Sequence, residues 1–204
     1  MSDNPLQPQR YVVAVTGASG AIYAVNLLRR LAPIAERVDV ILSENAPSVL
    51  ATEMGITLPQ PYSARDYLGG ESDYPSIRFH NPKDYYTSPA SGSYRHDGMV
   101  IVPCSMGTLG RIASGVSDDL TTRAADVCLK ERRKLILVPR ESPLNLIHLR
   151  NMVAVAEAGA TILPAMPAFY HRPQTVEDLM DTVVARILQA LNVPQEIVPQ
   201  WQAD

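Results

Sequence analysis

The chain has 204 residues, of which 46% are hydrophobic, 19% charged and 6% aromatic, and its formal net charge is −3. These values predict one globular domain over residues 1–204 and exclude a disordered chain, a collagen and a coiled coil. The small negative charge gives no general attraction to nucleic acid or anionic lipid, so we expect neither as a partner.

No apolar run approaches the roughly 18 residues of a membrane span, so we expect no membrane insertion. Residues 1–10 are polar and lack the apolar stretch of a secretory signal. The chain holds two cysteines, Cys104 and Cys128, which are too few for a disulfide framework. We therefore expect a cytoplasmic protein with a flexible N-terminus at residues 1–10 and a C-terminal tail at residues 193–204.

Short continuous apolar runs are typical of strands that helices cover on both faces. In chain order they occur at residues 12–15, 38–42, 99–102 and 135–138, with a weaker one at 161–163. Helical patterns separate or follow them, at residues 21–31, 45–54, 119–132, 144–158 and 176–191. This alternation predicts an α/β fold with three α/β/α layers and a doubly wound, mostly parallel sheet of the Rossmann-like or flavodoxin-like kind.

Two helices have recognisable ends. Ser142 followed by Pro143 predicts the start of the helix at 144–158, and Gly159 predicts its end. Thr175, with an aspartate three residues later, predicts a capping box at the start of the last helix. Residues 59–97 are rich in Pro, Ser, Gly and Tyr and predict a long irregular segment, of the kind that forms lids or binding loops.

The first predicted strand runs directly into a turn of small residues, 16–21, and then into a helix. Small residues let the backbone approach a ligand, and N–H groups at a helix start attract phosphate. The turn has Ser19 and Ile22 at the second and third glycine positions of the dinucleotide fingerprint, and it lacks the lysine of the ATPase phosphate loop. It therefore favours a phosphate ligand of neither class, and a turn needed only for packing is the alternative.

Three further strand exits are polar. They are Ser43-Glu44, the hydroxyl-rich turn at residues 103–108, and Pro139-Arg140-Glu141-Ser142. The second of these opens a helix and suits a phosphate or the polar edge of a flavin. Because the carboxyl ends of parallel strands meet at one edge of the sheet, the four exits together predict a ligand site there.

The helix at 119–132 carries a polar stripe of Arg123, Asp126, Lys130 and Arg133. A solvated charged face is the ordinary interpretation, and cations that hold an anion are the functional one.

Three other residue types carry less chemistry. Cys104 has no histidine beside it in sequence and is predicted to be a buried structural thiol. The four histidines lack paired metal-ligand spacing, so we expect no metal. Glu53, taken by itself, is an ordinary helix surface residue.

Five motifs, in this order, resemble those of the UbiX-type flavin prenyltransferases, over roughly residues 11–201. They are Thr16-Gly17-Ala18-Ser19-Gly20-Ala21, Pro103-Cys104-Ser105 through Thr108, Arg123-Ala124-Ala125-Asp126-Val127 with Leu129-Lys130-Glu131-Arg132-Arg133, Pro139-Arg140-Glu141-Ser142-Pro143-Leu144, and Pro167-Ala168-Phe169-Tyr170-His171-Arg172-Pro173-Gln174. The resemblance implies transfer of a dimethylallyl group from dimethylallyl phosphate to N5 and C6 of reduced FMN. The product, prenylated FMN, would serve a UbiD-type decarboxylase, often in ubiquinone biosynthesis. It also implies a metal-independent homododecamer with sites between subunits.

The resemblance also implies a role for individual residues. Those implied to contact FMN are Gly17, Ala18, Ser19, Ser43, Ser105, Met106, Gly107, Thr108 and Arg140. Those implied around the substrate are Tyr85, Arg123, Lys130, Glu141, Tyr170 and Arg186, with Arg186 reaching in from a neighbouring subunit and Arg140 also contacting the prenyl phosphate. Glu53 matches a carboxylate beside the flavin that assists proton movement. Tyr85 stands where some members have tryptophan, and Trp201 is implied to belong to a closing C-terminal segment.

Two other functions stay open at this point. One is an FMN-dependent decarboxylase of peptidyl cysteine, whose relatives have a catalytic histidine after the first turn and a different substrate clamp. The other is a non-catalytic FMN carrier, which would need the two turns at 17–19 and 105–108 but not Lys130, Glu141 or Arg186.

Overall fold

The computed structural model describes residues 9–198. Within them, parallel strands form one sheet in the order β3-β2-β1-β4-β5-β6. Their bounds are β1 Arg10–Val15, β2 Arg37–Leu42, β3 Ile77–His80, β4 Gly98–Cys104, β5 Leu135–Pro139 and β6 Thr161–Ile162. The order reverses between β1 and β4, and this pair of strands is the switch point where ligands bind in doubly wound sheets.

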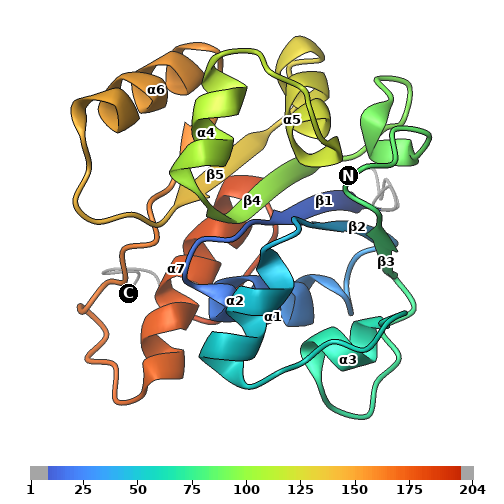
Figure 1. Ribbon diagram of the computed structural model, residues 1–204. Helices are drawn as coiled ribbons and strands as arrows, with labels where there is room; N and C mark the ends of the chain where they lie inside the picture. The colour runs from blue at the N-terminus through green and yellow to red at the C-terminus, as the bar shows by residue number, and fades with distance from the viewer. Residues whose placement is uncertain (1–8, 199–204) are drawn as a thin grey trace, which may run out of the picture.

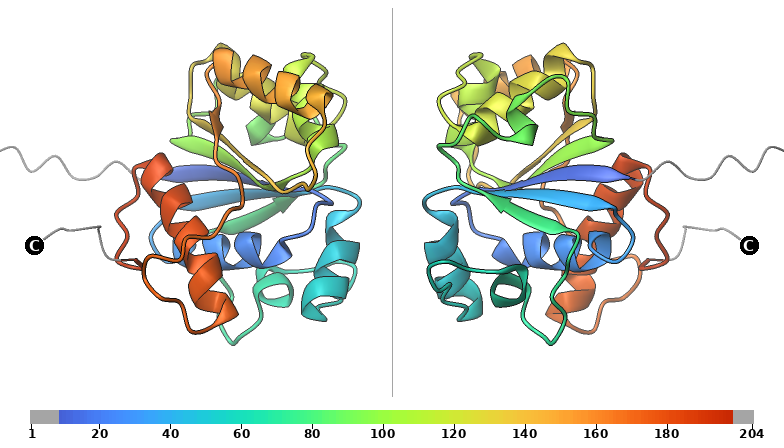
Figure 2. Two further views of the ribbon diagram at one scale, coloured as in Figure 1. Left: turned by 90° about the vertical axis from the view of Figure 1, so that its left-hand side faces the viewer. Right: turned by 90° about the vertical axis from the view of Figure 1, so that its right-hand side faces the viewer.

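Helices cover both faces of the sheet, as Figures 1 and 2 show. Their bounds are α1 Ala21–Leu31, α2 Ala46–Met54, α3 Ala64–Leu68, α4 Met106–Ala113, α5 Leu120–Lys130, α6 Leu146–Glu157 and α7 Val176–Leu191, with a short 3-10 helix, η1, at Ser88–Ala90. One core lies between the sheet and α1, α2, α3 and α7, and a second lies between the sheet and α4, α5 and α6. The predicted three-layer α/β fold is confirmed.

Alternate residues of each central strand enter the two cores. In β1, Val13 and Val15 face the first core while Val12 and Ala14 face the second. This double burial explains why the central strands read as continuous apolar runs rather than as alternating ones.

The predicted irregular segment at 59–97 is partly wrong, because it contains α3 and the edge strand β3. Only Ile77 and Phe79 are apolar in β3, so the strand has too short a pattern to be recognised. Its register against β2, with Ile77 opposite Val38, is a long-range feature. The rest of the segment, residues 81–97, crosses the sheet on the side of α5 and contains η1.

The predicted start of the helix at residues 144–158, which is α6 in the structure, is also wrong. The N-cap of α6 is Asn145, whose side chain accepts a hydrogen bond from the backbone N–H of His148 at 2.8 Å. Asparagine satisfies an orphan N–H group there, so Ser142 and Pro143 lie in the preceding loop. Gly159, with a φ of 105°, ends the helix as predicted. The capping box at Thr175 is confirmed.

Within residues 9–198, no helix combines the length and the apolar character that crossing a membrane requires. The predicted flexible N-terminus falls mostly on residues outside the described range. The predicted tail is described only as far as residue 198, so Trp201 lies outside the described residues.

Candidate functional site

The exits of β1 and β4 are joined at the switch point by one buried threonine. Thr16 is 2% exposed, and its Oγ1 donates to the carbonyl of Pro103 at 2.7 Å. The same oxygen accepts a hydrogen bond from the backbone N–H of Ser105 at 2.8 Å. Thr16 therefore fixes the two glycine- and serine-rich turns against each other. The sequence shows Thr16 at the start of a motif but does not predict this role.

The N-terminus of α1 is capped from another helix. Its N-cap, Gly20, has a φ of 114° and no side chain to offer. Glu53 of α2 takes that place, because its Oε2 accepts hydrogen bonds from the N–H groups of Gly20 at 2.9 Å and Ala21 at 2.8 Å. The expectation that this helix start attracts phosphate is therefore wrong for these two N–H groups, since a carboxylate of the chain already uses them.

Burial raises the pKa of Glu53, but hydrogen bonds from Ser19, Gly20 and Ala21 lower it by more, and the pKa lies below its ordinary value. The charge of Arg140 lowers this pKa further. Glu53 is thus an ionised carboxylate held directly beside Ser19. The structure places this exposed residue beside the turn after β1.

The first turn and Ser43 form a feature that we call the cradle, and it leaves no room for a side chain at Gly17. A Cβ atom at Gly17 would lie 2.7 Å from the Cβ of Asn45, closer than real Cβ contacts allow. Beside it, the hydroxyl of Ser43 is buried and has no hydrogen-bond partner among the described residues. A buried hydroxyl without a partner is costly unless a ligand satisfies it. Asn45 is a site neighbour that sequence reasoning missed.

The turn after β4 begins α4. Ser105 is the N-cap, and its Oγ accepts a hydrogen bond from the N–H of Thr108 at 3.2 Å and donates to Thr108 Oγ1 at 3.0 Å. The N–H groups of Met106 and Gly107 belong to the first helical turn, where N–H groups have no partner within the helix. This turn is suited to an anionic or strongly polar group.

Arg140, directly after β5, reaches back across the switch point. Its Nε donates to the carbonyl of Ser19 at 3.3 Å, and its backbone N–H donates to the carbonyl of Cys104 at 3.4 Å. Glu141 follows it, exposed, with Oε1 accepting from the N–H of Ser142 at 3.0 Å. The structure therefore brings together at one edge the predicted residues of the β1, β2, β4 and β5 exits, Glu53 included.

These residues fit a flavin mononucleotide. The buried Ser43 hydroxyl lacks a partner among the described residues and can bond a polar ligand, and the start of α4 provides N–H donors. The residues of the site are mostly half-buried or exposed, so the edge is open to a ligand.

Lys130 lies away from this group in the same chain, and Arg123, near the start of α5, pairs with Asp126. Lys130 ends α5 and pairs with Glu131, whose Oε1 is 2.7 Å from its Nζ. Lys134, a few residues later, precedes β5, and its carbonyl accepts a hydrogen bond from the N–H of Met99 at the start of β4. Arg140 follows the other end of β5. A strand of this length spans roughly 16 Å. One chain alone therefore does not place Lys130 beside Arg140.

Two predicted aromatic residues lie in connecting segments. The hydroxyl of Tyr85, in the segment between β3 and β4, donates to the carbonyl of Ser117 at 3.4 Å. Tyr170, between β6 and α7, is 73% exposed.

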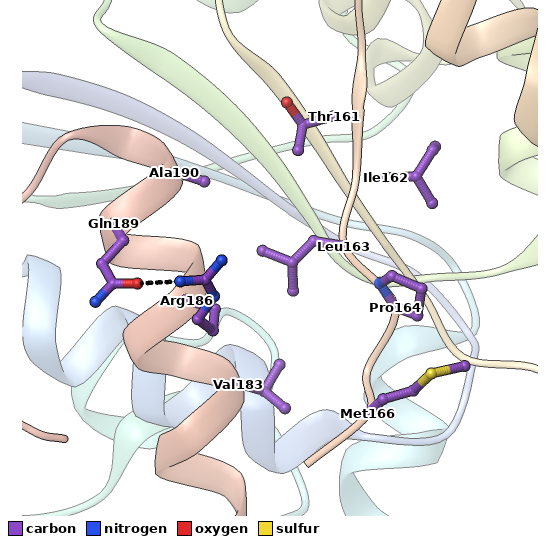
Figure 3. A pocket seen from close by; sticks show the side chains of 9 residues that line it. All are labelled: Thr161, Ile162, Leu163, Pro164, Met166, Val183, Arg186, Gln189 and Ala190. Atoms are coloured by element: carbon purple, nitrogen blue, oxygen red, sulfur yellow. Dashed lines mark hydrogen bonds between the residues drawn. The ribbon is translucent and has the colours of Figure 1, made fainter. Parts of the chain in front are cut away.

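Arg186 lines a cavity of about 460 Å³ between the β6 edge and α7 (Figure 3). Its Nη1 donates to Oε1 of Gln189 at 2.8 Å. Apolar side chains such as Leu163 and Val183 form much of the remaining lining. Arg186 thus faces a cavity whose lining does not include Arg140, although the N–H of Ala165, between the lining residues Pro164 and Met166, donates to the carbonyl of Pro139 at 3.0 Å.

The two cysteines are free, and both are buried. Burial raises the pKa of the Cys104 thiol to about 12, so it stays protonated and unreactive near neutral pH, as predicted. Across residues 9–198, His, Cys, Asp and Glu side chains form no group of three or more that could hold a metal ion.

Comparison with known proteins identifies the family. The profile of the Flavoprotein family matches residues 2–188. The flavin prenyltransferase UbiX of Pseudomonas aeruginosa is 48% identical over 199 residues, which cover 95% of this chain and 94% of that protein. The chain belongs to the UbiX flavin prenyltransferase family. The UbiX protein of Halalkalibacterium halodurans is 44% identical, over 94% of this chain and 92% of that one.

Solved UbiX-family structures have the same fold. AnUbiX, in a crystal structure with FMN and dimethylallyl pyrophosphate, has a TM-score of 0.84 and 41% identity, covering 97% of this chain and 99% of that one. A dodecameric FMN-dependent UbiX-like decarboxylase from Escherichia coli O157:H7 has a TM-score of 0.84 and 42% identity, covering 96% of this chain and all of that one. The peptidyl-cysteine decarboxylase EpiD shares only 14% identity at a TM-score of 0.57, so its likeness concerns the fold alone.

Proposed function

We propose that this flavin prenyltransferase joins the dimethylallyl group of dimethylallyl phosphate to N5 and C6 of reduced FMN. The observation that carries the proposal is the buried, unpartnered hydroxyl of Ser43 in the cradle at the switch point, where the turn of Gly17 and the start of α4 also lie. The product, prenylated FMN, would then pass to a UbiD-type decarboxylase in the cytoplasm.

FMN would be held by the turns after β1 and β4. Ser43 would satisfy its buried hydroxyl on the ligand, and the first turn of α4 would donate N–H groups. Reduced flavin supplies the nucleophilic N5 and C6 atoms. Arg140, which is fixed on the carbonyl of Ser19, would border both the flavin and the phosphate of the second substrate.

The phosphate must leave with the electron pair of the broken carbon–oxygen bond. Fixed positive charge stabilises this departing anion, and such electrostatic preorganisation is usually the largest catalytic contribution. We assign that role to Lys130, Arg140 and Arg186, with Arg123 and Tyr170 as further phosphate contacts. Tyr85 would line the prenyl chain and help to exclude water, which would otherwise capture the carbon centre.

Ring closure at C6 needs a proton to be delivered and another removed. Glu53 and Glu141 are two carboxylates at this edge, and either can exchange a proton with bound water or substrate. The proton from C6 then leaves to a carboxylate or to solvent. Loss of ring closure in a Glu141→Gln enzyme, with substrate binding retained, is the expected result.

We propose that the complete site is shared between chains, because Lys130 and Arg140 lie at opposite ends of β5 in one chain. An exposed apolar face on α6, with Leu146, Ile147 and Val153, offers surface for self-association. The UbiX-like relative from Escherichia coli is dodecameric, and we propose the same assembly here.

The central experiment is a mass spectrum of flavin extracted after the protein is incubated with reduced FMN and dimethylallyl phosphate. A mass gain of one dimethylallyl group is expected, whereas an unchanged flavin would favour an FMN carrier. A parallel reaction with dimethylallyl diphosphate shows which ester is preferred. A peptide ending in cysteine tests the decarboxylase alternative, for which loss of carbon dioxide from the peptide would be the signal.

The shared site has its own test. Lys130→Ala and Arg140→Ala are each expected to be inactive. When the two variants are co-assembled, about one quarter of the sites should combine an intact Lys130 with an intact Arg140 from different chains. Recovered activity supports the shared site, and no recovery in a mixed assembly of native size would contradict it.

A further inference from the structure

Asp39 is a fully buried carboxylate in the middle of the sheet. It lies in β2 between Val38 and Val40, it is 0% exposed, and no role in the proposed chemistry has been given to it. Burying a charged group is costly unless each oxygen is hydrogen-bonded or paired. The groups that surround this carboxylate therefore indicate why the chain keeps it.

Donors from three segments satisfy it. Arg37 donates to Oδ1 through Nε at 2.9 Å and Nη2 at 2.7 Å. His80 Nε2 lies 2.6 Å from the same oxygen, and the Tyr94 hydroxyl donates to Oδ2 at 2.6 Å. Burial raises the pKa of Asp39, but the hydrogen bonds from His80, Tyr94 and Arg37 outweigh it and the pKa lies below its ordinary value.

The donors connect the sheet to residues 87–94, which we call the anchored loop. Tyr94 belongs to this loop and bonds Asp39 directly. Thr87 Oγ1 lies 2.5 Å from His80 Nδ1, and Arg37 Nη2 donates to Ser88 Oγ at 3.3 Å. The Arg37 guanidinium also lies 5.3 Å from the centre of the Tyr94 ring. Asp39 is thus the centre of a network that holds both ends of the anchored loop.

On its other side, the backbone of the anchored loop contacts cationic side chains of α5 and of the residues that follow it. The carbonyl of Ala90 accepts a hydrogen bond from Arg123 Nε at 3.1 Å. The carbonyl of Tyr94 accepts one from Arg133 Nη1 at 2.6 Å. At Gly92 a Cβ atom would lie 2.9 Å from Lys130 Nζ, so the loop backbone borders that ammonium group. Arg123 and Lys130 are two of the residues assigned above to the substrate phosphate.

We infer that Asp39 is a positioning residue, which acts through the anchored loop to fix Arg123 and Lys130 for binding the phosphate of dimethylallyl phosphate. This inference rests on the proposed function for the identity of the ligand. A purely structural carboxylate would lower stability when replaced and would leave ligand affinity unchanged. A positioning residue would weaken phosphate-ester binding selectively, because the flavin cradle lies at the other edge of the sheet.

The test uses full-length protein loaded with oxidised FMN, in which no transfer occurs. The dissociation constant of dimethylallyl phosphate is measured by calorimetry for wild type, Asp39→Asn and Tyr94→Phe, and that of FMN by fluorescence quenching. Hydrogen–deuterium exchange of residues 87–94 reports whether the loop has loosened. Leu28→Ala is the matched control, because Leu28 is 0% exposed in α1 on the opposite face of the sheet.

We expect Asp39→Asn to weaken dimethylallyl phosphate binding about tenfold, with faster exchange in the loop and FMN affinity changed by less than about twofold. Tyr94→Phe, which removes one hydrogen bond, should have a smaller effect in the same direction and keeps the test usable if Asp39→Asn fails to fold. Unchanged ester affinity in a variant with a loosened loop would overturn the inference, as would an equal loss of ester affinity in Leu28→Ala.

The two proposals can fail separately. Wild-type protein that binds the ester but never produces prenylated flavin would refute the proposed function, while the ratio of dissociation constants would still decide the role of Asp39. Wild-type protein that does not bind the ester refutes the positioning role.

Discussion

Glu53 gives the most specific prediction, because it both caps α1 and stands beside the proposed flavin. Its Oε2 accepts hydrogen bonds from the backbone N–H groups of Gly20 and Ala21, and the Gly20 nitrogen also lies 3.1 Å from Oε1. In Glu53→Gln the amide oxygen can replace Oε2, but an NH₂ group would then face the N–H of Gly20. Loss of this charged cap should lower the free energy of unfolding by about 1 kcal/mol. For a chain of this size, the melting temperature should fall by about 2–4 °C.

The loss should depend on pH. Because the pKa of Glu53 in the folded protein is below its ordinary value of 4.5, the carboxylate stabilises the fold above that pH. Its contribution disappears as the pH falls through the folded pKa. The difference in free energy of unfolding between wild type and Glu53→Gln, measured with urea, should therefore be largest at neutral pH and should shrink in acid.

Catalysis should respond more strongly than stability does. We expect product formation in Glu53→Gln to fall about a hundredfold, the scale of a lost proton-transfer group, with FMN still bound. Glu44→Gln is the matched control, since Glu44 is an exposed carboxylate that pairs with Lys83 at the next strand exit. If Glu53→Gln and Glu44→Gln have the same free energy of unfolding and the same rate of product formation, the assigned role of Glu53 is wrong.

Three further predictions concern the cradle and one buried histidine. Gly17→Ala should weaken FMN binding at least about tenfold in a flavin titration, because its Cβ would meet that of Asn45 at 2.7 Å; native affinity would contradict the cradle. Ser43→Ala should leave the unfolding midpoint of flavin-free protein unchanged or higher but weaken FMN binding, since its buried hydroxyl has no partner among the described residues; a destabilised apoprotein with native affinity would disprove this. Burial and the charge of Arg133 lower the pKa of His96, so the unfolded chain binds a proton first as pH falls below about 6.5. Stability should therefore decline below that pH, and the urea midpoint of His96→Gln should not show this decline. The same pH dependence in both proteins would show that another group causes it.

The order of strands and helices could be predicted because central strands buried on both faces need uninterrupted apolar runs. The small-residue turn at 17–19 and the hydroxyl-rich turn at 105–108 were likewise visible, since backbone access and N–H donors require particular residue types locally. The edge strand β3 could not be recognised, because its four residues gain their place only by pairing with β2. The cap of α6 moved from Ser142 to Asn145 because two competing capping residues stood within one loop.

The sequence by itself determined the central strands, the main helices and which polar groups leave the sheet at its carboxyl edge, because all depend on local patterns and on the geometry common to parallel sheets. Only the tertiary structure decided that Glu53 caps α1, that Thr16 joins two turns and that Asp39 holds the anchored loop. These contacts join residues that are 32, 89 and 55 positions apart in the chain. Hydrogen bonds over such separations depend on how the layers pack, and that packing leaves no periodic trace in the sequence.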